Sequence, residues 1–453
     1  MPDMTPDTTL NVNALIDRSR ISRMQYAIYF LGALAFGLDG LDTQIIGYIA
    51  PALLDAFHAP RAVLGELFSS GLIGLLIGSL AIGPFADKFG RKRVIILSVA
   101  SFGLFTLISA FSSTIGELVM WRFITGLGLG AAIPNIMALV ADYCPAKRRA
   151  TVIMLVAAAN AAGATLGALL ASVLLPQWGW RAMFYFGGIA PLVLAVFLCF
   201  YLQESLSWLI VRKRAPELVA RLAANIGGPL GGVRLIAEGE QGVDYRTFLT
   251  RYMREPRNVI NTLAIMVIYF MVMFEMFFMS SWITTVLVEN GMPIRTAIHT
   301  SSLFQTGGFV GMILIAFFAA GKDITRLFTA MLLAACLSIV VTSFTLHGTL
   351  PVISAMLFIT GFLLVPCLPG GSSIVGRTYP VAIRATAFGA AYAAGRLGSV
   401  FGPLFGQRLH EMGVPSETIF LAAALPCLIA ALAVLVVHYN TTRRPSGMLP
   451  ATK

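Results

Sequence analysis

The sequence predicts an all-α membrane protein with twelve transmembrane helices in two six-helix repeats. The first observation is composition: 57% of the 453 residues are hydrophobic, only 12% are charged, and the mean hydropathy is +0.83. These values lie far outside the usual range of soluble domains. The second observation is that apolar stretches of membrane-spanning length recur along the chain, and the third is an internal repeat of the sequence.

Each apolar stretch is about twenty residues long, which lets a helix cross a hydrocarbon core about 30 Å thick. The long polar segment 204–258 separates six stretches from six. We therefore expect a cytoplasmic amino-terminal tail, a first six-helix bundle, a cytoplasmic linker, a second six-helix bundle and a cytoplasmic carboxyl-terminal tail, over residues 1–25, 26–203, 204–258, 259–438 and 439–453. The twelve stretches lie near 26–50, 66–85, 94–112, 117–139, 150–174, 182–202, 259–288, 300–320, 326–346, 350–376, 383–407 and 416–438.

The two halves share a sequence pattern at a constant offset in residue number. PAKRRAT at 145–151 and PVAIRAT at 380–386 have the same P-x-x-x-R-A-T frame. Gly163 and Gly167 are four residues apart, as are Gly398 and Gly402, and this spacing lets helices approach closely. Two repeated six-helix halves are typical of carriers that alternate access around a central site. The same offset relates Gly126 to Gly361, Pro134 to Pro369, Gly163 to Gly398 and Gly167 to Gly402.

Basic residues are concentrated on one side of the predicted membrane. The net charge is +11, from 32 Lys and Arg against 21 Asp and Glu. With the amino terminus in the cytoplasm, 26 of the 32 basic residues fall in segments predicted to be cytoplasmic, which is the positive-inside bias. The basicity is therefore explained without a nucleic-acid partner. The five cysteines show no C-x-x-C spacing, so we expect free thiols and neither a metal nor a cofactor.

The segment between the second and third spans, GPFADKFGRKR at 83–93, carries the most specific motif. It resembles the G-x-x-x-D-[RK]-x-G-R-[RK] signature of the major facilitator superfamily, which has it at the same place. The resemblance implies the major facilitator fold and a cytoplasmic gate. We assign Gly83, Asp87, Gly90 and Arg91 to this gate, with Asp142 as a partner for its charges. The alternative is an ordinary positive-inside loop.

Two carboxylates, Asp39 and Asp42, interrupt the first span. Because they are three residues apart, we expect both on the same helix face. A charged side chain near the bilayer midplane costs about 2.5 to 3.5 kcal/mol on insertion scales, and this cost indicates a function. We expect the pair to line a polar cavity, where burial and mutual repulsion favour the binding of a proton. The alternative is a packing pair satisfied by backbone groups or by a buried arginine.

Several segments together resemble the aromatic acid:proton symporter family within this superfamily: DGLDTQIIGYIAPAL at 39–53, SSWITTVLVENG at 280–291 and IRATAFGAAYAAGRLGSVFGPL at 383–404. The resemblance implies that Asp39 and Asp42 are the acidic pair needed for transport. It makes Arg396 the arginine of the family's G-R-x-G-S stretch. Arg122, in the fourth span, resembles the superfamily arginine that is implicated in proton coupling. Where the family tends to have W-L-P in the seventh span, this chain has Trp282, Ile283 and Thr284.

Arg396 is the candidate for recognition of an acid. The repeat relates it to Ala161, so the charge is an addition that the repeat does not require. Its planar guanidinium matches a carboxylate in bidentate fashion, and we expect it to bind the substrate. A permanent salt bridge to an acidic residue, Glu275 or one of the first-span aspartates, is the alternative.

The seventh span combines aromatic residues with an unexpected acid. Tyr269, Phe274 and Trp282 suit a flat ring, although core or lipid contact is the alternative for each. Glu275 stands opposite Asp42 at an offset close to that of the repeat. It is either a third proton site or a salt-bridge partner for an arginine.

These residues predict a proton-coupled symporter that imports a small aromatic carboxylate, such as benzoate or a hydroxybenzoate, by alternating access. We expect a monomer in the bacterial cytoplasmic membrane with both termini in the cytoplasm, binding an aromatic acid anion and protons. A carrier of a non-aromatic organic acid and an exporter are the alternatives on the same fold. An enzyme is not expected, because the chain shows no nucleophile motif and no His-rich metal pattern.

Overall fold

The structure, a computed structural model, describes residues 9–212, 214–228, 234–236, 252–318, 323–346, 348–379 and 381–442. The chain forms two compact units. The first comprises Met1–Gly242 and Met292–Ser302, and the second comprises Val243–Gly291 and Leu303–Lys453. Each unit is built from long helices, as the apolar stretches predict.

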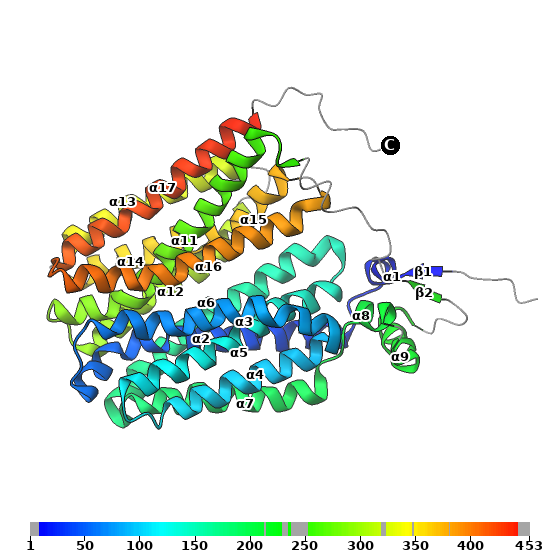
Figure 1. Cartoon of the computed structure of the whole chain (residues 1–453), viewed down its shortest axis with the longest axis horizontal. Helices are drawn as coiled ribbons and strands as arrows, with labels where there is room; N and C mark the ends of the chain where they lie inside the picture. Colours follow the sequence, from blue (N-terminus) through cyan, green and yellow to red (C-terminus); the bar gives the residue numbers. More distant parts are fainter. Residues whose placement is uncertain are drawn as a thin grey trace, which may run out of the picture. The chain divides into compact units, whose positions relative to one another are not determined.

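Six long helices form the first unit (Figure 1). At one end of the bundle lies a small cluster of short elements from the amino-terminal tail and the linker, in which strand β1 (Thr9–Asn11) pairs in parallel with β2 (Arg234–Ile236). The short helices of this cluster are α1 (Val12–Arg18), α8 (Leu206–Val211) and α9 (Pro216–Gly227). The long helices are α2 (Arg23–Phe57), α3 (Val63–Phe89), α4 (Arg91–Ser109), α5 (Ile115–Asp142), α6 (Ala146–Trp178) and α7 (Arg181–Tyr201).

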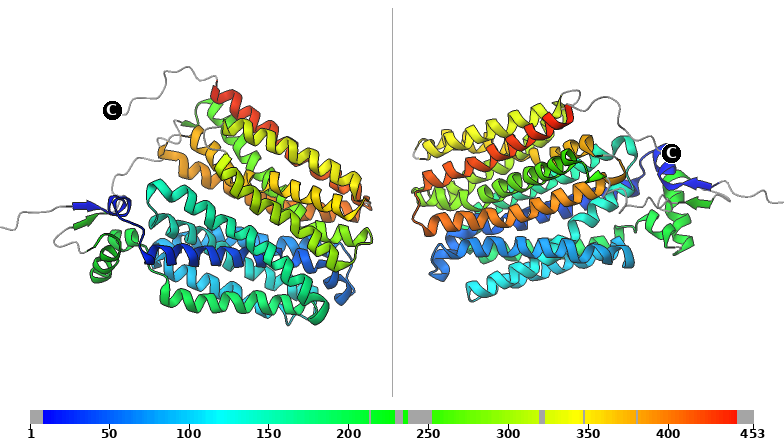
Figure 2. Two further views of the ribbon diagram at one scale, coloured as in Figure 1. Left: turned by 180° about the vertical axis from the view of Figure 1, so that it is seen from behind. Right: turned by 45° about the horizontal axis from the view of Figure 1, so that its top comes forward.

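The second unit repeats this helical arrangement. Helix α11 packs against α16 and α17, just as α2 packs against α6 and α7 in the first unit. Figure 2 shows α13 and α17, in yellow and red, running side by side. The helices are α11 (Pro256–Glu289), α12 (Ile294–Phe318), α13 (Ile324–Thr345), α14 (Leu350–Leu364), α15 (Cys367–Thr378), α16 (Val381–Glu411) and α17 (Ser416–Thr442), with α12 belonging to this unit from Leu303 onward.

Eleven segments of the described chain are long and apolar enough to cross a membrane. One of them, Leu350–Thr378, contains both α14 and α15, because the predicted tenth span is interrupted at Pro366, which lacks an N–H and disfavours continuous helix. Helix α16 is a further long helix, which brings the eleven segments to twelve. It is less apolar than the eleven because it carries Arg396, Arg408 and many small residues. The predicted membrane fold of two six-helix repeats is confirmed.

Close helix contacts at glycines confirm the internal repeat. A Cβ atom on Gly163 would overlap the backbone of Gly37, and the equivalent Gly398 stands in the same way against Phe270. These four residues join α6 to α2 and α16 to α11. Two further pairs, Gly126 with Gly71 and Gly361 with Phe304, are related in the same manner. The later helices of each unit thus share one offset in residue number, and the first two helices share a slightly smaller one.

Candidate functional site

Asp42 is fully buried inside the first unit and forms an ion pair with Arg122. The guanidinium of Arg122, on α5, donates to the Asp42 carboxylate through both terminal nitrogens, at 3.0 Å to Oδ1 and 2.9 Å to Oδ2. It also donates to the backbone oxygen of Asp42 at 3.1 Å. Thr106, on α4, donates to Oδ1 at 2.7 Å. This is the bidentate geometry in which an arginine binds a carboxylate most strongly.

Asp39 lies one turn earlier on α2 and bonds to a different helix. Asn160, on α6, donates to Asp39 Oδ2 at 2.8 Å, and Thr43 donates to Oδ1 at 3.4 Å. In this conformation the two aspartates therefore bond to different neighbouring helices. Three residues along a helix differ by about 60° in direction, and on α2 this difference turns Asp42 toward α4 and α5 and Asp39 toward α6.

Arg396 lies in the second unit, on α16, with its side chain against aromatic rings. It is 8% exposed, and its guanidinium carbon stands 5.0 Å from the ring centre of Tyr392, one helical turn earlier. Its NH2 group donates to the Tyr392 hydroxyl at 3.0 Å, whereas its buried Nε atom has no hydrogen-bond acceptor in the described structure. The alternative of a permanent salt bridge is not seen, since no described carboxylate stands within ion-pair distance of Arg396.

Tyr269, on α11, joins this aromatic cluster. Its ring centre lies 6.5 Å from that of Tyr392 and 6.1 Å from that of Phe388, in edge-to-face arrangements. Tyr269 is 2% exposed, and its hydroxyl also lacks a hydrogen-bond partner among the described groups. The structure thus places two buried donors without acceptors, Arg396 Nε and the Tyr269 hydroxyl, beside the same ring of Tyr392.

The other two aromatic candidates of α11 lie outside this cluster. The ring of Phe274 packs against Phe270 and Phe405. The Trp282 side chain is fully buried, stacks on His410 with ring centres 4.3 Å apart, and donates its indole N–H to the backbone oxygen of Pro403 at 3.1 Å. Of the three aromatic residues assigned to the substrate, the structure therefore brings only Tyr269 close to Arg396.

Glu275 is a fully buried carboxyl on α11. Neither of its side-chain oxygens has a hydrogen-bond partner in the described part of the chain. The groups that interact with it electrostatically are the thiols of Cys336, on α13, and Cys427, on α17. Within the described residues, Glu275 therefore forms no ion pair with Arg396.

A polar cluster joins the predicted cytoplasmic ends of α4 and α5 to the start of the linker. Arg91 forms an ion pair with Asp142, as expected, and Ser205 donates to the same carboxylate at 2.6 Å. Glu204 accepts the backbone N–H groups of Arg91 and Lys92 at 2.8 and 3.1 Å, so a negative charge stands at the amino terminus of α4. We call Arg91, Asp142, Glu204 and Ser205 the cytoplasmic cluster, after the side of the membrane on which the sequence predicts them.

Two further residues complete this region. Gly90 has a φ of 97°, and a Cβ atom there would overlap the Glu204 carboxylate, so glycine suits the turn between α3 and α4. Burial, followed by the charges of Asp142 and Glu204, raises the pKa of Tyr143, whose hydroxyl donates to the backbone oxygen of Glu204 at 2.5 Å. Gly83 and Asp87 belong to α3, but their surroundings lie outside what the structure describes.

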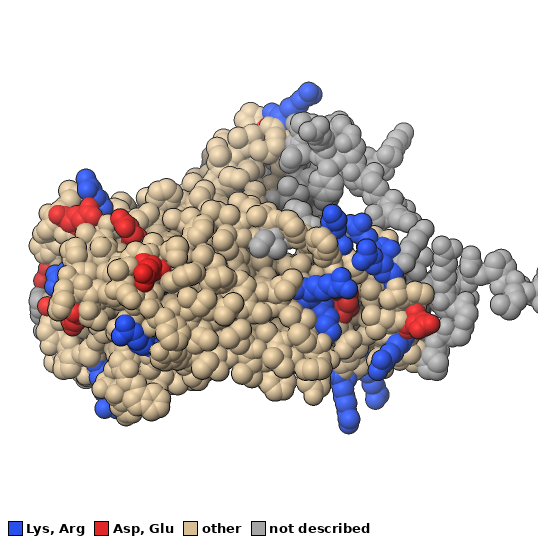
Figure 3. Space-filling model, turned by 60° about the horizontal axis from the view of Figure 1, so that its bottom comes forward, with Lys and Arg blue, Asp and Glu red and all other residues tan. Residues whose placement is uncertain are grey.

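Basic side chains are exposed at several helix ends that the sequence predicts to be cytoplasmic. Figure 3 shows Lys and Arg side chains at both ends of the view, while uncharged residues cover most of the surface between them. Lys88, Arg93, Lys147 and Arg148 are exposed at the ends of α3, α4 and α6 that we assign to the cytoplasm.

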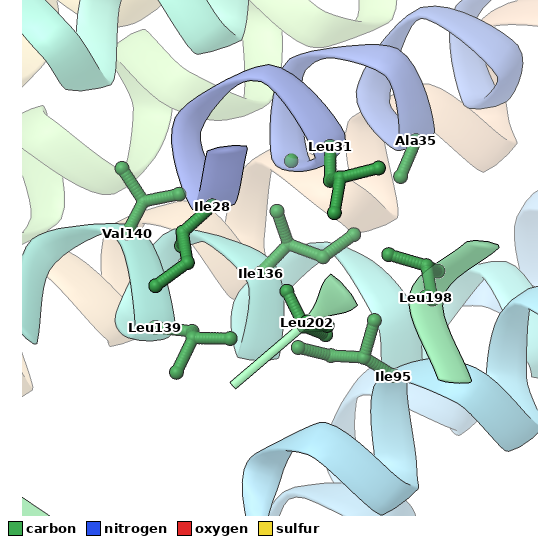
Figure 4. Close-up of a pocket in the computed structure, with 10 residues that line it drawn as sticks. Ile28, Leu31, Ala35, Ile95, Ile136, Leu139, Val140, Leu198 and Leu202 are labelled. Atoms are coloured by element: carbon green, nitrogen blue, oxygen red, sulfur yellow. The ribbon is translucent and has the colours of Figure 1, made fainter. Parts of the chain in front are cut away.

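A small pocket in the first unit does not suit an acid. It lies between α2, α4, α5 and α7, and Figure 4 shows that aliphatic side chains such as Ile28, Leu31, Ile136 and Leu198 line it. A binding site for a carboxylate needs a few polar groups to fix the ligand, and this lining supplies none. We therefore assign no substrate to this pocket.

Sequence reasoning missed three residues that hold the candidate side chains. Thr106 and Asn160 bond the two aspartates, and Tyr392 bonds Arg396. Asn160 has a signal in the sequence, because it is a polar residue inside the apolar, alanine-rich stretch of α6. Tyr392 also has one, since a residue four positions before Arg396 faces the same side of a helix.

Comparison with known proteins places the chain among transporters. A family model described as Major Facilitator Superfamily matches residues 32–367 and 325–452. The chain is 32% identical over 452 residues to the 4-hydroxybenzoate transporter of Acinetobacter baylyi, covering 97% of each protein. It is 31% identical over 433 residues to the gallate transporter of Pseudomonas putida, covering 95% of each.

The fold also resembles a solved structure. A bacterial homologue of the human lysosomal transporter Spinster, solved in an inward-facing and unoccupied conformation, matches with a TM-score of 0.71 over 94% of this chain and 99% of that one. The identity is 16%, so this likeness concerns the fold alone.

Proposed function

The chain belongs to the major facilitator superfamily and, within it, to the aromatic acid:proton symporter family, and from this membership we propose that it is a proton-coupled importer of a small aromatic carboxylate. Benzoate and hydroxybenzoates are the substrate class, because relatives about 30% identical are named for 4-hydroxybenzoate and gallate. Transport proceeds by alternating access across the bacterial cytoplasmic membrane, and the carrier works as a monomer.

The observation that carries this proposal is the arrangement of Arg396, Tyr392 and Tyr269. A buried guanidinium with an unused Nε donor stands next to aromatic rings, and a second unused donor, the Tyr269 hydroxyl, belongs to the same cluster. A carboxylate would satisfy the guanidinium, and an aromatic ring would pack edge-to-face against the tyrosines. This pairing of one cation with several rings is the complement of an aromatic acid.

Proton coupling is assigned to the first unit, at Asp39, Asp42 and Arg122. Protonation of Asp42 would remove the charge that holds the Arg122 guanidinium through two hydrogen bonds. A buried ion pair that loses one charge is destabilised strongly, so proton binding favours another arrangement of α2 and α5. In this way one proton shifts the balance between two conformations.

The test is uptake into liposomes that contain the purified carrier. With an imposed proton gradient, we expect accumulation of labelled benzoate or 4-hydroxybenzoate together with acidification of the lumen. Unlabelled aromatic acids should compete, whereas the neutral amides and non-aromatic acids of similar size should not. Accumulation without proton movement would contradict symport, and stronger competition by an aliphatic acid would make the carrier one for non-aromatic acids.

The proposed orientation places both termini and the 204–258 linker in the cytoplasm, where the cytoplasmic cluster and the residues of the GPFADKFGRKR motif, including Gly83 and Asp87, form the gate. We expect a reporter that works only in the cytoplasm to be active when fused at Gly231 or at the carboxyl terminus. The physical reason is the excess of Lys and Arg in these segments. Activity of a periplasmic reporter at either site would contradict this orientation.

A further inference from the structure

The surroundings of Glu275 favour its neutral form over an ionised carboxylate. Its side chain is fully buried, and neither oxygen has a donor or cation to stabilise a negative charge within the described structure. The thiols of Cys336 and Cys427 are its electrostatic neighbours and offer no positive charge. An ionised carboxylate in such a place is very costly, whereas a neutral carboxyl is tolerated.

Several described charged groups on the helices that pack against α11, and on their neighbours, have partners other than Glu275. These pairs are Arg377 with Asp323, Arg326 with Asp323, Arg396 with Tyr392, Arg408 with Glu411 and His410 with Glu289.

The internal repeat makes Glu275 the structural counterpart of Asp42. Because Gly163 contacts Gly37 in the same way as Gly398 contacts Phe270, Gly37 on α2 corresponds to Phe270 on α11. Five positions further along each helix, Asp42 therefore corresponds to Glu275. Both residues are fully buried, each within its own unit. A carboxyl therefore occupies the same position of the first helix in both repeats.

The partner of this carboxyl differs between the repeats. The contact of Gly126 with Gly71 matches that of Gly361 with Phe304, so Gly126 on α5 corresponds to Gly361 on α14. Four positions earlier on each helix, Arg122 corresponds to Leu357. Leu357 is 1% exposed and cannot bond a carboxylate. The first repeat thus contains an acid paired with an arginine, and the second contains the acid without one.

We propose that Glu275 is a second proton-binding carboxyl of the transport cycle, in the second repeat, at the position that Asp42 occupies in the first. This inference rests on the proposed function as a proton-coupled carrier. Packing alone does not account for the residue, because leucine or glutamine would fill the same space without an ionisable group. When the conformation changes and water from the cytoplasm reaches this part of the second unit, Glu275 releases its proton there, and it binds a new proton from the outer side before the next substrate crosses.

The experiment measures the number of protons moved per substrate. The wild-type carrier, Glu275→Gln and the control Glu117→Gln, which removes an exposed carboxylate at the start of α5, are compared in liposomes held at zero membrane voltage. The measurement is the pH gradient at which net benzoate flux stops against a fixed benzoate gradient. Glu275→Gln should exchange labelled for unlabelled benzoate at the wild-type rate but couple about one proton fewer per substrate. The control should match the wild type in both measurements.

An unchanged ratio in Glu275→Gln would overturn the assignment, because it would mean that the residue stays protonated throughout the cycle. If the wild type itself moves no protons, the proposed function fails, and this result is distinct. If Glu275→Gln does not fold, the proposal is tested on the wild-type protein instead. The protein is treated with a hydrophobic carbodiimide, which modifies protonated carboxyls. Modification of Glu275, mapped by mass spectrometry, should decrease as pH rises, whereas constant modification would overturn the proposal.

Discussion

Replacing Asp42 by asparagine is expected to abolish proton-driven accumulation of substrate and to destabilise the carrier. Asparagine keeps the shape of the side chain but can neither bind the transported proton nor neutralise Arg122. The guanidinium would remain 4% exposed, with its counter-charge removed. Breaking one side of a buried ion pair costs roughly 3 to 5 kcal/mol, which predicts a clear decrease in the thermal midpoint of the purified protein.

The double variant Asp42→Asn with Arg122→Gln separates the two effects. Removal of both charges leaves no uncompensated ion, so we expect the thermal midpoint to recover while accumulation stays absent. Asp39→Asn provides a comparison, because Asp39 bonds Asn160 and Thr43 on another side of α2. Normal accumulation and normal lumen acidification in Asp42→Asn would show that Asp42 does not carry the coupling proton.

Much of the fold could be predicted because its signals are local or periodic. The apolar stretches predict the helices. Glycines recur at equivalent positions of the two repeats, such as Gly163 and Gly398, because a larger side chain there would overlap the backbone of the facing helix. The interruption between α14 and α15 is also visible in the sequence as Pro366. The twelve stretches do not reveal it, because hydropathy is insensitive to so short a break.

The partners of the candidate residues could not be predicted in the same way. Asp39 and Asp42 look equivalent in the sequence, but helices surround α2 on several sides, so a rotation of about 60° gives them different neighbours. The pairing of Asp42 with Arg122 joins residues that are distant in the chain, and no local rule selects it. Glu275 illustrates the converse, because its missing partner is recognised only when the repeat identifies Leu357 as the counterpart of Arg122.

Replacing Arg396 by alanine is expected to lower the affinity for aromatic acids about tenfold to a hundredfold and to leave the affinity for their neutral amides nearly unchanged. Hydrogen bonds to charged groups contribute about 1.5 to 3 kcal/mol, which corresponds to this range. Lysine at this position should restore part of the affinity, since it supplies a point charge without the planar fork. Binding of each ligand to detergent-purified protein gives the comparison.

Tyr392→Phe is the matched control for this prediction. It keeps the ring 5.0 Å from the guanidinium carbon and removes only the hydroxyl that accepts from Arg396 NH2. If Arg396 binds the substrate, loss of this hydrogen bond leaves the guanidinium less well oriented. The affinity for acids should then decrease, but by less than in Arg396→Ala. Because no described carboxylate pairs with Arg396, removing Glu275 should not rescue Arg396→Ala. A well-folded Arg396→Ala carrier that retains its full preference for acids over amides would exclude the carboxylate role, and the aromatic rings alone would then have to explain recognition.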